Sequence, residues 1–316
     1  MSAMKLIIAA MLAAGLARPG WGAETTAAFL KIGVGARPNA MGNAYTAVAD
    51  DINAIAWNPA GLSLAGRREM GATDAEMFAD TRYDFIGYAQ PIRGKDGADY
   101  GTAGFALQYL TQGTIEGRDA NRQATGGFTA ADMAVDLAYS RAVGGGLRLG
   151  ANLKYIQSAI ADVTARSFAA DLGGMLSTPI SGLTLGAAVQ NMGPGMRFLD
   201  QTEPLPLTVT EGAAYRLGST GLLLAFDVRT LPNDGYTTVS FGAEYALFSA
   251  LSLRAGYLSG AARGTATGSA TSKQLGNLAG FGTGLGIRMG SYNLDYSFTP
   301  FGELGNVQRV SLGAKF

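Results

Sequence analysis

The side chains that most often carry out chemistry in proteins are absent from this sequence. Its 316 residues include no histidine and no cysteine, so the commonest general base, the commonest metal ligand and the thiolate nucleophile are all missing. Serine without histidine gives no hydrolase triad of the ordinary kind. We therefore expect no enzymatic activity, no catalytic residues and no cofactor.

Two short stretches could still bind a small ligand. The adjacent carboxylates Asp50 and Asp51 suggest a site for a hard cation, but neighbouring side chains point apart, so helix capping and solvation are favoured and no metal site is predicted. The stretch GFGTGLG (280–286) superficially resembles a phosphate loop, but it lacks a closing lysine and a strand-to-helix context. Its glycines are expected to relieve the curvature of a sheet.

The charge balance and the first residues indicate the compartment. Lysine plus arginine and aspartate plus glutamate both total 24, so no basic surface points to a nucleic-acid partner. Lys5 precedes an apolar run at 6–16, and small residues follow before Glu24. This pattern resembles a secretory signal peptide over residues 1–23, with Glu24 as the mature start. An uncleaved anchor is the alternative.

The rest of the chain is expected to form strands, because it contains no run of roughly 18 continuous apolar residues. From about Arg67 onward, apolar and polar residues alternate in segments that turn-forming clusters separate. In ADMAVDLAYS (131–140), Leu137 falls on the apolar face and Asp136 on the polar face. We count roughly fourteen segments of about 10 to 13 residues, longer than strands of soluble proteins usually are. Alternation alone also fits a soluble β-sandwich.

The connections favour a barrel over a sandwich. Short turns alternate with long loops at 112–127, 191–206 and 259–277, although one long turn, at 93–101, falls on the short side. This rhythm predicts an all-β fold, a 14-stranded antiparallel transmembrane β-barrel over residues 67–316 with outer-membrane lipid as its partner. The long loops are expected to face outward, and the short turns and both termini the periplasm.

The last strand agrees with a location in the bacterial outer membrane. The chain ends VQRVSLGAKF, with Val310, Leu312 and Phe316 on one face. This ending resembles the terminal aromatic signal by which bacterial outer-membrane barrels are recognised for assembly. Ala314 departs from the pattern, since an aromatic residue is more usual there. An ordinary last amphipathic strand is the alternative.

The segment from Phe29 to Gly66 has the most specific pattern in the chain. The matching residues are Gly35, Ala36, Arg37, Met41, Gly42, Ala44, Ala47, Asp50, Asp51, Trp57, Asn58, Pro59, Ala60, Gly61 and Leu62. They resemble the N-terminal signature of the PorV/PorQ family, itself similar to the FadL family of outer-membrane transport proteins. The resemblance implies a 14-stranded barrel with a small N-terminal helical hatch, residues 24–66, folded inside the lumen.

Apolar spacing within the hatch is compatible with this resemblance. Met41, Ala44, Tyr45 and Val48 recur at helical intervals, which predicts a short helix with one apolar side. A carrier of hydrophobic molecules should have a contiguous apolar pocket near the hatch. The side chains that could line it are those of Met41, Tyr45, Val48, Ile52, Ile55 and Trp57.

The stretch WNPAGL (57–62) leads into the first strand in this interpretation. Asp51 could cap a second short helix over INAIAW (52–57), and Pro59 forces Asn58 out of the helical conformation. Trp57 would then pack against the barrel wall. A structural role for Asn58 is favoured; gating of a substrate path by Asn58 and neighbouring backbone groups is the alternative.

The lumen faces carry nearly balanced charges, which are expected to rigidify the interior without selecting for ion sign. They include Asp132, Asp136, Arg148, Lys154, Asp171, Asp227, Arg229, Glu244, Arg254, Arg288 and Asp295. Two functions follow from the resemblance. The favoured one is protein secretion, as a type IX-like shuttle or accessory protein with exported proteins or secretion machinery as partners. The other is a FadL-like channel for uptake of hydrophobic compounds such as fatty acids.

A partner surface is predicted for the secretion function. The loop at 191–206 has the apolar residues Met192, Met196, Phe198 and Leu199 among its residues. Exposed apolar groups on an outer loop often mark an interaction site. This loop is therefore the candidate for contact with exported proteins.

Overall fold

The structure is a computed structural model that describes residues 25–118, 121–259, 280–300 and 305–316. The signal peptide expected at 1–23, the start at Glu24 and nearly all of the loop at 259–277 lie outside these residues. No helix in the described part of the chain is long and apolar enough to cross a membrane.

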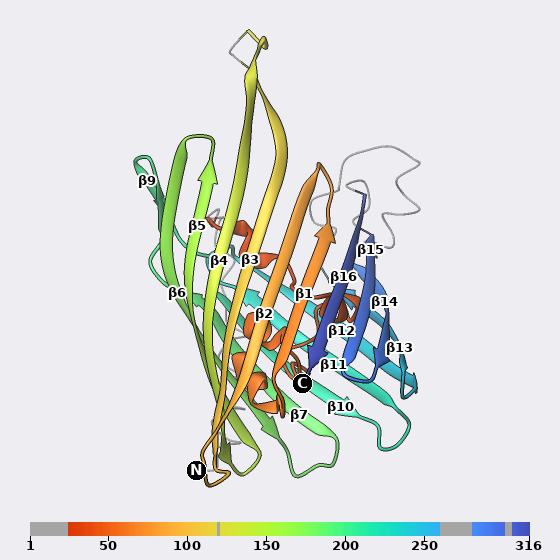
Figure 1. The fold of residues 1–316 in the computed structure, drawn as a ribbon. Helices are drawn as coiled ribbons and strands as arrows, with labels where there is room; N and C mark the ends of the chain where they lie inside the picture. Colours follow the sequence, from red (N-terminus) through yellow and green to blue (C-terminus); the bar gives the residue numbers. More distant parts are fainter. Residues whose placement is uncertain (1–24, 119–120, 260–279, 301–304) are drawn as a thin grey trace.

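Fourteen antiparallel strands close into a barrel in which β1 pairs with both β2 and β16 (Figure 1). The strands are β1 (Glu69–Glu76), β2 (Thr81–Arg93), β3 (Asp99–Arg118), β4 (Ala124–Gly144), β5 (Leu147–Ile160), β6 (Val163–Ser177), β7 (Leu183–Met192), β10 (Thr208–Arg216), β11 (Leu222–Leu231), β12 (Tyr236–Phe248), β13 (Leu251–Leu258), β14 (Phe281–Met289), β15 (Tyr292–Pro300) and β16 (Asn306–Lys315). Closure leaves no free edge, as hydrocarbon requires. The predicted 14-stranded barrel is confirmed. β8 (Met196–Phe198) and β9 (Gln201–Glu203) form a separate two-stranded sheet.

The two ends of the barrel differ in their connections. The turns at 145–146, 178–182 and 290–291 lie at the end where β16 finishes, which we call the turn end. The strand ends that flank 119–123, 193–207 and 259–280 lie at the opposite, loop end, as the sequence predicts, but the short connections at 77–80, 161–162 and 232–235 lie at this end too, so the expected separation of short turns from long loops holds only in part. The long turn at 94–98 belongs to the turn end, so that exception is also as expected.

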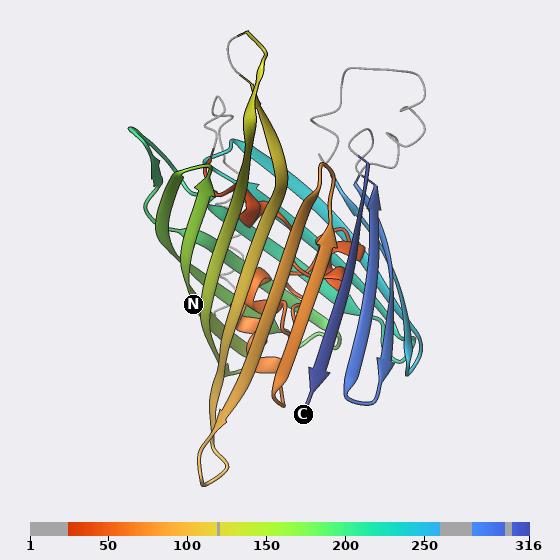
Figure 2. The same cartoon turned by 45° about the horizontal axis from the view of Figure 1, so that its top comes forward.

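The expected loop at 112–127 is mostly strand, which corrects the sequence interpretation. β3 and β4 contain 20 and 21 residues, beyond the expected length of about 10 to 13, while β1 has only 8. Ile115 faces Phe128 in the ladder, and the two strands project past their neighbours as a hairpin (Figures 1 and 2). Threonine, isoleucine and phenylalanine favour strand pairing even beyond the part of the barrel that alternates apolar and polar residues.

The two faces of the wall separate as the alternation predicts. Leu137 is 60 % exposed on the outside, whereas its neighbour Asp136 is fully buried in the lumen. Leu153 and Phe168 are likewise exposed, and Lys154 is buried. The outward face is therefore apolar and the lumen contains the charges, as in a membrane-spanning barrel.

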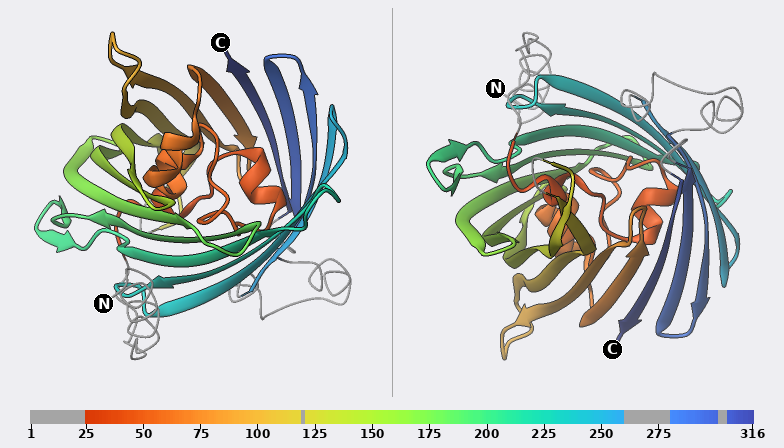
Figure 3. Two further views of the ribbon diagram at one scale, coloured as in Figure 1. Left: turned by 90° about the horizontal axis from the view of Figure 1, so that it is seen from below. Right: turned by 90° about the horizontal axis from the view of Figure 1, so that it is seen from above.

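Residues 25–66, which we call the inner segment, lie inside the ring of strands (Figure 3). The segment contains four short helices, η1 (Ala28–Lys31), α2 (Ala36–Ala40), α3 (Ala54–Trp57) and η2 (Pro59–Leu64). The helix expected from Met41 to Val48 is wrong. Gly42 and Asn43 have φ angles of +62° and +67°, so these left-handed residues end α2 and the chain continues as turns.

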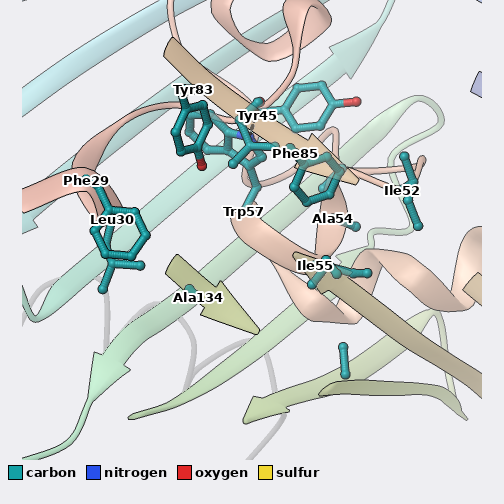
Figure 4. Close-up of a cluster of buried hydrophobic side chains, with 14 of the residues drawn as sticks. Phe29, Leu30, Tyr45, Ile52, Ala54, Ile55, Trp57, Tyr83, Phe85 and Ala134 are labelled. Atoms are coloured by element: carbon teal, nitrogen blue, oxygen red, sulfur yellow. Dashed lines mark hydrogen bonds between the residues drawn. The ribbon is translucent and has the colours of Figure 1, made fainter. Parts of the chain in front are cut away.

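The residues that lead into the first strand follow the predicted conformations in part. Asp51 accepts a hydrogen bond from the Asn53 backbone nitrogen (3.0 Å), but α3 begins only at Ala54. Asn58 is extended, with φ −153°, as its position before Pro59 requires. The buried apolar cluster joins this segment to the wall, and Figure 4 shows Trp57 and Ile55 among its members.

Candidate functional site

The inner segment contacts every strand of the barrel wall. Its contacts are Ile52 with β1 and β2, Ile55 with β3, Ala60 with β4 and β5, Asn58 with β6, Thr46 with β7 and β10, Tyr45 with β11, Met41 with β12 and β13, Asn39 with β14, α2 with β15, and Ala36 with β16. The segment therefore reaches the whole circumference of the lumen in this conformation.

Glycines of the wall make this close fit possible. A Cβ at Gly256 would lie 2.1 Å from the carbonyl carbon of Met41, and one at Gly150 would lie 2.3 Å from that of Pro59. A Cβ at Gly186 would lie 2.5 Å from the Thr46 oxygen. Since no real Cβ tolerates such distances, backbone of the inner segment occupies the space of missing side chains. Glycine content alone did not reveal these partners, although lumen-facing glycine on successive strands is a usable signal.

Asn58 fastens the WNPAGL stretch to the wall. Its side-chain nitrogen donates to the carbonyl oxygens of Thr46 (2.8 Å) and Gly174 (3.1 Å), and its oxygen accepts from the Ala60 nitrogen (3.2 Å). The side chain is fully buried. The neighbouring Pro59 and Ala60 rest on Gly150. Asn58 therefore links the inner segment to β6, and the choice between a structural role and a gating role stays a prediction.

A wall carboxylate supports the middle of the inner segment. Asp227 of β11 accepts hydrogen bonds from the backbone nitrogens of Tyr45 (2.9 Å) and Thr46 (2.8 Å). The sequence places Asp227 in the lumen but does not identify these donors, because they lie about 180 residues earlier in the chain. Charge-assisted bonds of this kind are stronger than neutral ones.

Arg37 is the centre of a charged cluster that joins the inner segment to the wall. Its guanidinium donates two hydrogen bonds to Glu244 of β12 (2.7 and 2.9 Å) and also pairs with Asp50 and, at 3.3 Å, with Asp51. Arg254 of β13 donates to the same Glu244 (2.6 Å). The sequence signature includes Arg37, Asp50 and Asp51, and the structure brings them together.

Arg37 keeps its positive charge over the ordinary pH range. Burial by itself would lower the pKa of Arg37, but Asp50, Tyr45, Glu244 and Asp51 outweigh it and raise the pKa well above its usual value. Burial raises the pKa of Tyr45 well above its usual value. The Tyr45 hydroxyl therefore stays protonated and donates to Asp51 (2.7 Å).

Two aromatic rings and two guanidiniums form a central column through the inner segment. Arg37 lies over the Tyr45 ring at 5.4 Å, and Tyr45 meets Trp57 edge-on with ring centroids 6.1 Å apart. Arg229 of β11 lies over the Trp57 ring at 5.7 Å. The Trp57 indole nitrogen donates to the Val34 carbonyl oxygen (2.9 Å). Trp57 therefore packs inside the segment as well as against the wall.

The central column separates two cavities of different size. On the turn-end side, Arg37, Asp50, Glu244, Arg254 and other charged residues line a cavity of about 490 Å³, which we call the vestibule. On the loop-end side, Trp57 and Arg229 line a space of only about 10 Å³.

The six apolar side chains expected to line a binding pocket are instead packed in the core. They are Met41, Tyr45, Val48, Ile52, Ile55 and Trp57, each at most 5 % exposed. Burial in the core leaves these side chains no free surface with which to line an apolar pocket in this conformation.

The predicted partner loop is only partly exposed. Met192 ends β7, and Met196 is fully buried in the apolar cluster, so the expectation of an exposed side chain is wrong for Met196. The sheet β8–β9 turns Met196 inward and packs Phe198 against the same cluster. Leu199, with φ +52°, is 75 % exposed.

Comparison with solved structures shows the fold. The toluene transporter TodX of Pseudomonas putida has a TM-score of 0.64 and 13 % identity, over 90 % of this chain and 99 % of that chain. The toluene transporter TbuX of Ralstonia pickettii has a TM-score of 0.63 and 15 % identity, over 90 % of this chain and 98 % of that chain. A FadL homologue of Pseudomonas aeruginosa has a TM-score of 0.55 and 12 % identity, over 90 % of this chain and 98 % of that chain.

Comparison by sequence gives the family. No curated protein matches the sequence. A family model matches residues 8–167, just over half of the 316 residues, and that family is described only as uncharacterised. The chain therefore belongs to the Uncharacterised protein family (UPF0164).

Proposed function

We propose that this outer-membrane barrel is a channel for the uptake of hydrophobic small molecules, with the inner segment as its hatch. The proteins with the same fold reported above are toluene transporters and a FadL homologue, which supports this reading. Protein secretion, favoured from the sequence, rests on the PorV/PorQ resemblance alone. The fold comparisons therefore favour transport.

The observation that carries the proposal is an apolar cluster inside the lumen, on the loop-end side of the hatch. Phe29 and Leu30 of η1, Leu110 of β3, Met196 and Leu205 are all buried there. A water-filled porin has a polar interior. Apolar side chains in this position offer a hydrophobic solute a favourable environment after it leaves water.

The route on from this cluster leads through the hatch. The central column of Arg37, Tyr45, Trp57 and Arg229 lies between these five loop-end side chains and the vestibule. A hydrophobic solute that crosses must displace an aromatic ring of the column or the backbone around it. Trp57, the largest of these side chains, is therefore the principal obstacle.

Uptake of labelled toluene by cells that lack other hydrophobic-compound channels tests the proposal. Cells with the wild-type protein should take up toluene faster than cells with the empty vector, and Trp57→Ala should change that rate. Phe168→Ala, on the lipid face, is the matched aromatic control and should leave the rate unchanged. Equal uptake with the wild-type protein and the empty vector would contradict the proposal.

The same cells can test secretion. Under the secretion reading, Phe198→Ser with Leu199→Ser should abolish co-purification with an exported protein, while the barrel stays folded. Under the channel proposal, these substitutions do not affect any such association. Loss of co-purification together with unchanged uptake in Trp57→Ala would favour secretion.

A further inference from the structure

The carboxylates that line the vestibule are recessed and paired with cations. The pairs are those of Arg37 with Asp50, Asp51 and Glu244, of Arg254 with Glu244 and Asp295, and of Lys315 with Glu69. Four of the five carboxylate side chains are at most 16 % exposed, and that of Asp50 is 35 % exposed. They therefore present little negative charge to a ligand in the cavity.

Three further arginines line the vestibule without a partner. Arg67 precedes β1, Arg216 ends β10 and Arg288 lies on β14. None of their side chains forms an ion pair or a hydrogen bond with any residue that the structure describes. All three are exposed. The accessible charge of the cavity is therefore positive, although its lining includes six cations and five carboxylates in total.

The strand faces place these charges in the lumen. Tyr215, next to Arg216, and Ile287, next to Arg288, are exposed on the outer face of the wall. Because successive side chains of a strand point to opposite faces, both arginines face the lumen. They point away from phospholipid head groups, which are a common partner of basic residues at a membrane surface. Their position favours a ligand inside the cavity.

A neighbouring cavity of about 170 Å³ extends the basic lining toward β5. It shares Asp50 and Arg216 with the vestibule, and Arg148 of β5 also lines it. Arg148 forms no ion pair with a described residue, and its Nε is buried without a hydrogen-bond acceptor. Figure 3, left, views the barrel from this end. Four guanidiniums without a carboxylate partner therefore line two adjoining cavities.

We propose that the vestibule binds a compact, hydrophilic anion with two or more negative charges, such as a tricarboxylate or a phosphate ester. A guanidinium fork matches two oxygens of a carboxylate or phosphate group. An anion with several charges can use more than one arginine at a time, whereas an anion with a single charge cannot. Such a ligand would bind on the turn-end side of the hatch.

The size and the other lining residues of the vestibule fit this class of ligand. Its volume of about 490 Å³ lies within the range of about 300 to 1,000 Å³ that is usual for small-molecule sites. The hydroxyl groups of Ser249, Ser252 and Ser291 also line it and can donate hydrogen bonds to further ligand oxygens. The inference does not rest on the channel function, because no hydrophobic solute takes part in it.

Multivalent negative charge has two sources, a free small anion and an acidic segment of a protein. We assign the site to the small anion, because the arginines line an enclosed cavity of small-molecule size. Citrate, acetate and a tetraglutamate peptide with capped ends separate the alternatives. They provide three charges on a compact molecule, a single charge, and several charges on a longer chain.

Calorimetric titration of the purified full chain, in a nonionic detergent without divalent cations, tests the site. Citrate should bind once per chain and about tenfold or more tightly than acetate. Arg216→Gln with Arg288→Gln should weaken citrate binding about tenfold or more, because charge-assisted contacts are lost. Arg141→Gln is the matched control, since this exposed arginine at the same end lies on the outer face of β4 and has no described ion pair. Its affinity for citrate should equal that of the wild-type protein.

The other outcomes of the titration contradict the site. Equal citrate affinity in the wild-type protein and the double variant, or an equal loss in Arg141→Gln, would overturn it. Tighter binding of the peptide than of citrate would assign the arginines to an acidic protein segment and overturn the compact ligand. Toluene uptake without citrate binding refutes this site alone, and citrate binding without toluene uptake refutes the channel alone.

A stability measurement protects the test from a folding defect. Without ligand, the double variant should unfold at the same temperature as the wild-type protein, because these arginines have no partner to lose. A lower unfolding temperature would assign them a structural role and contradict the site. Citrate should raise the unfolding temperature of the wild-type protein more than that of the double variant. If the double variant does not fold, Arg67→Gln with Arg288→Gln should show the same loss of citrate binding.

Discussion

At the scale of the residue, the fit of the inner segment depends on positions of the wall that have no side chain. Gly173 and Gly174 are neighbours on β6 and face opposite sides. A Cβ at Gly173 would lie 2.1 Å from the Asn58 side-chain oxygen and 2.8 Å from Pro59, whereas one at Gly174 has its nearest atom at 3.8 Å. The same substitution at the two positions therefore separates the fit of the segment from the general effect of replacing glycine.

Gly173→Ala should lower the free energy of unfolding by about 1 to 3 kcal/mol, the usual cost of overpacking. Gly174→Ala should change it by less than about 1 kcal/mol, because the added methyl meets only ordinary contacts. Urea unfolding in detergent, followed by the heat-modifiable gel shift, measures both. Equal changes in the free energy of unfolding at the two positions would contradict the assigned contact between the WNPAGL stretch and β6.

The sequence identified one side of these contacts only. Its N-terminal signature includes Arg37 and Asn58, and strand alternation correctly places Asp227 and Glu244 in the lumen. The pairings could not be predicted, because Arg37 and Glu244 are separated by 207 residues and depend on barrel closure and register.

At the scale of the element, periodicity predicted strand faces better than strand ends. Leu137 and Asp136 were assigned correctly because a period of two fixes the face of each residue once the lumen is known. The predicted loop boundaries at 112–127 are wrong because strand pairing continues outside the membrane, where alternation of apolar and polar residues is no longer required. The helix expected at 41–48 does not form, because Gly42 and Asn43 adopt left-handed conformations in spite of the apolar spacing.

The lipid face gives a prediction on a single strand. Leu137→Arg should reduce the free energy of unfolding by about 2 to 4 kcal/mol if the residue lies near mid-bilayer. Val143→Arg, on the same face of β4 near its turn, should cost only about 0 to 1 kcal/mol. The same urea unfolding assay applies. If Leu137→Arg is as stable as Val143→Arg, the position of the barrel in the membrane is wrong.

At the scale of the whole molecule, the difference between the two ends predicts orientation. The loop end should face the outside of the cell and the turn end the periplasm. The exposed residues Arg118 and Arg122 lie near the tip of the projecting hairpin, and the exposed Lys95 lies in the turn at 94–98. Trypsin added to intact cells should therefore cut after Arg118 or Arg122. Cleavage after Lys95 should need permeabilised cells, and its appearance in intact cells would reverse the orientation.

Under the proposed channel function, a solute passes only when the inner segment moves, because this segment contacts all fourteen strands. The chain has no cysteine, so a reversible lock can be added without background. A Cβ at Gly71 would lie 3.7 Å from the Ile52 Cβ, close to the typical disulfide separation of about 3.8 Å. Ile52→Cys with Gly71→Cys should therefore link the segment to β1, and each single substitution is a control.

Toluene uptake by cells with this double variant, measured before and after reduction, tests the central claim most directly. Uptake should be slow, near that of the empty vector, while the disulfide is formed, and should recover toward the rate of the single variants after reduction. Uptake at the same rate in the oxidised and reduced states, with the disulfide verified on a gel, would show that the inner segment does not gate passage and would contradict the account.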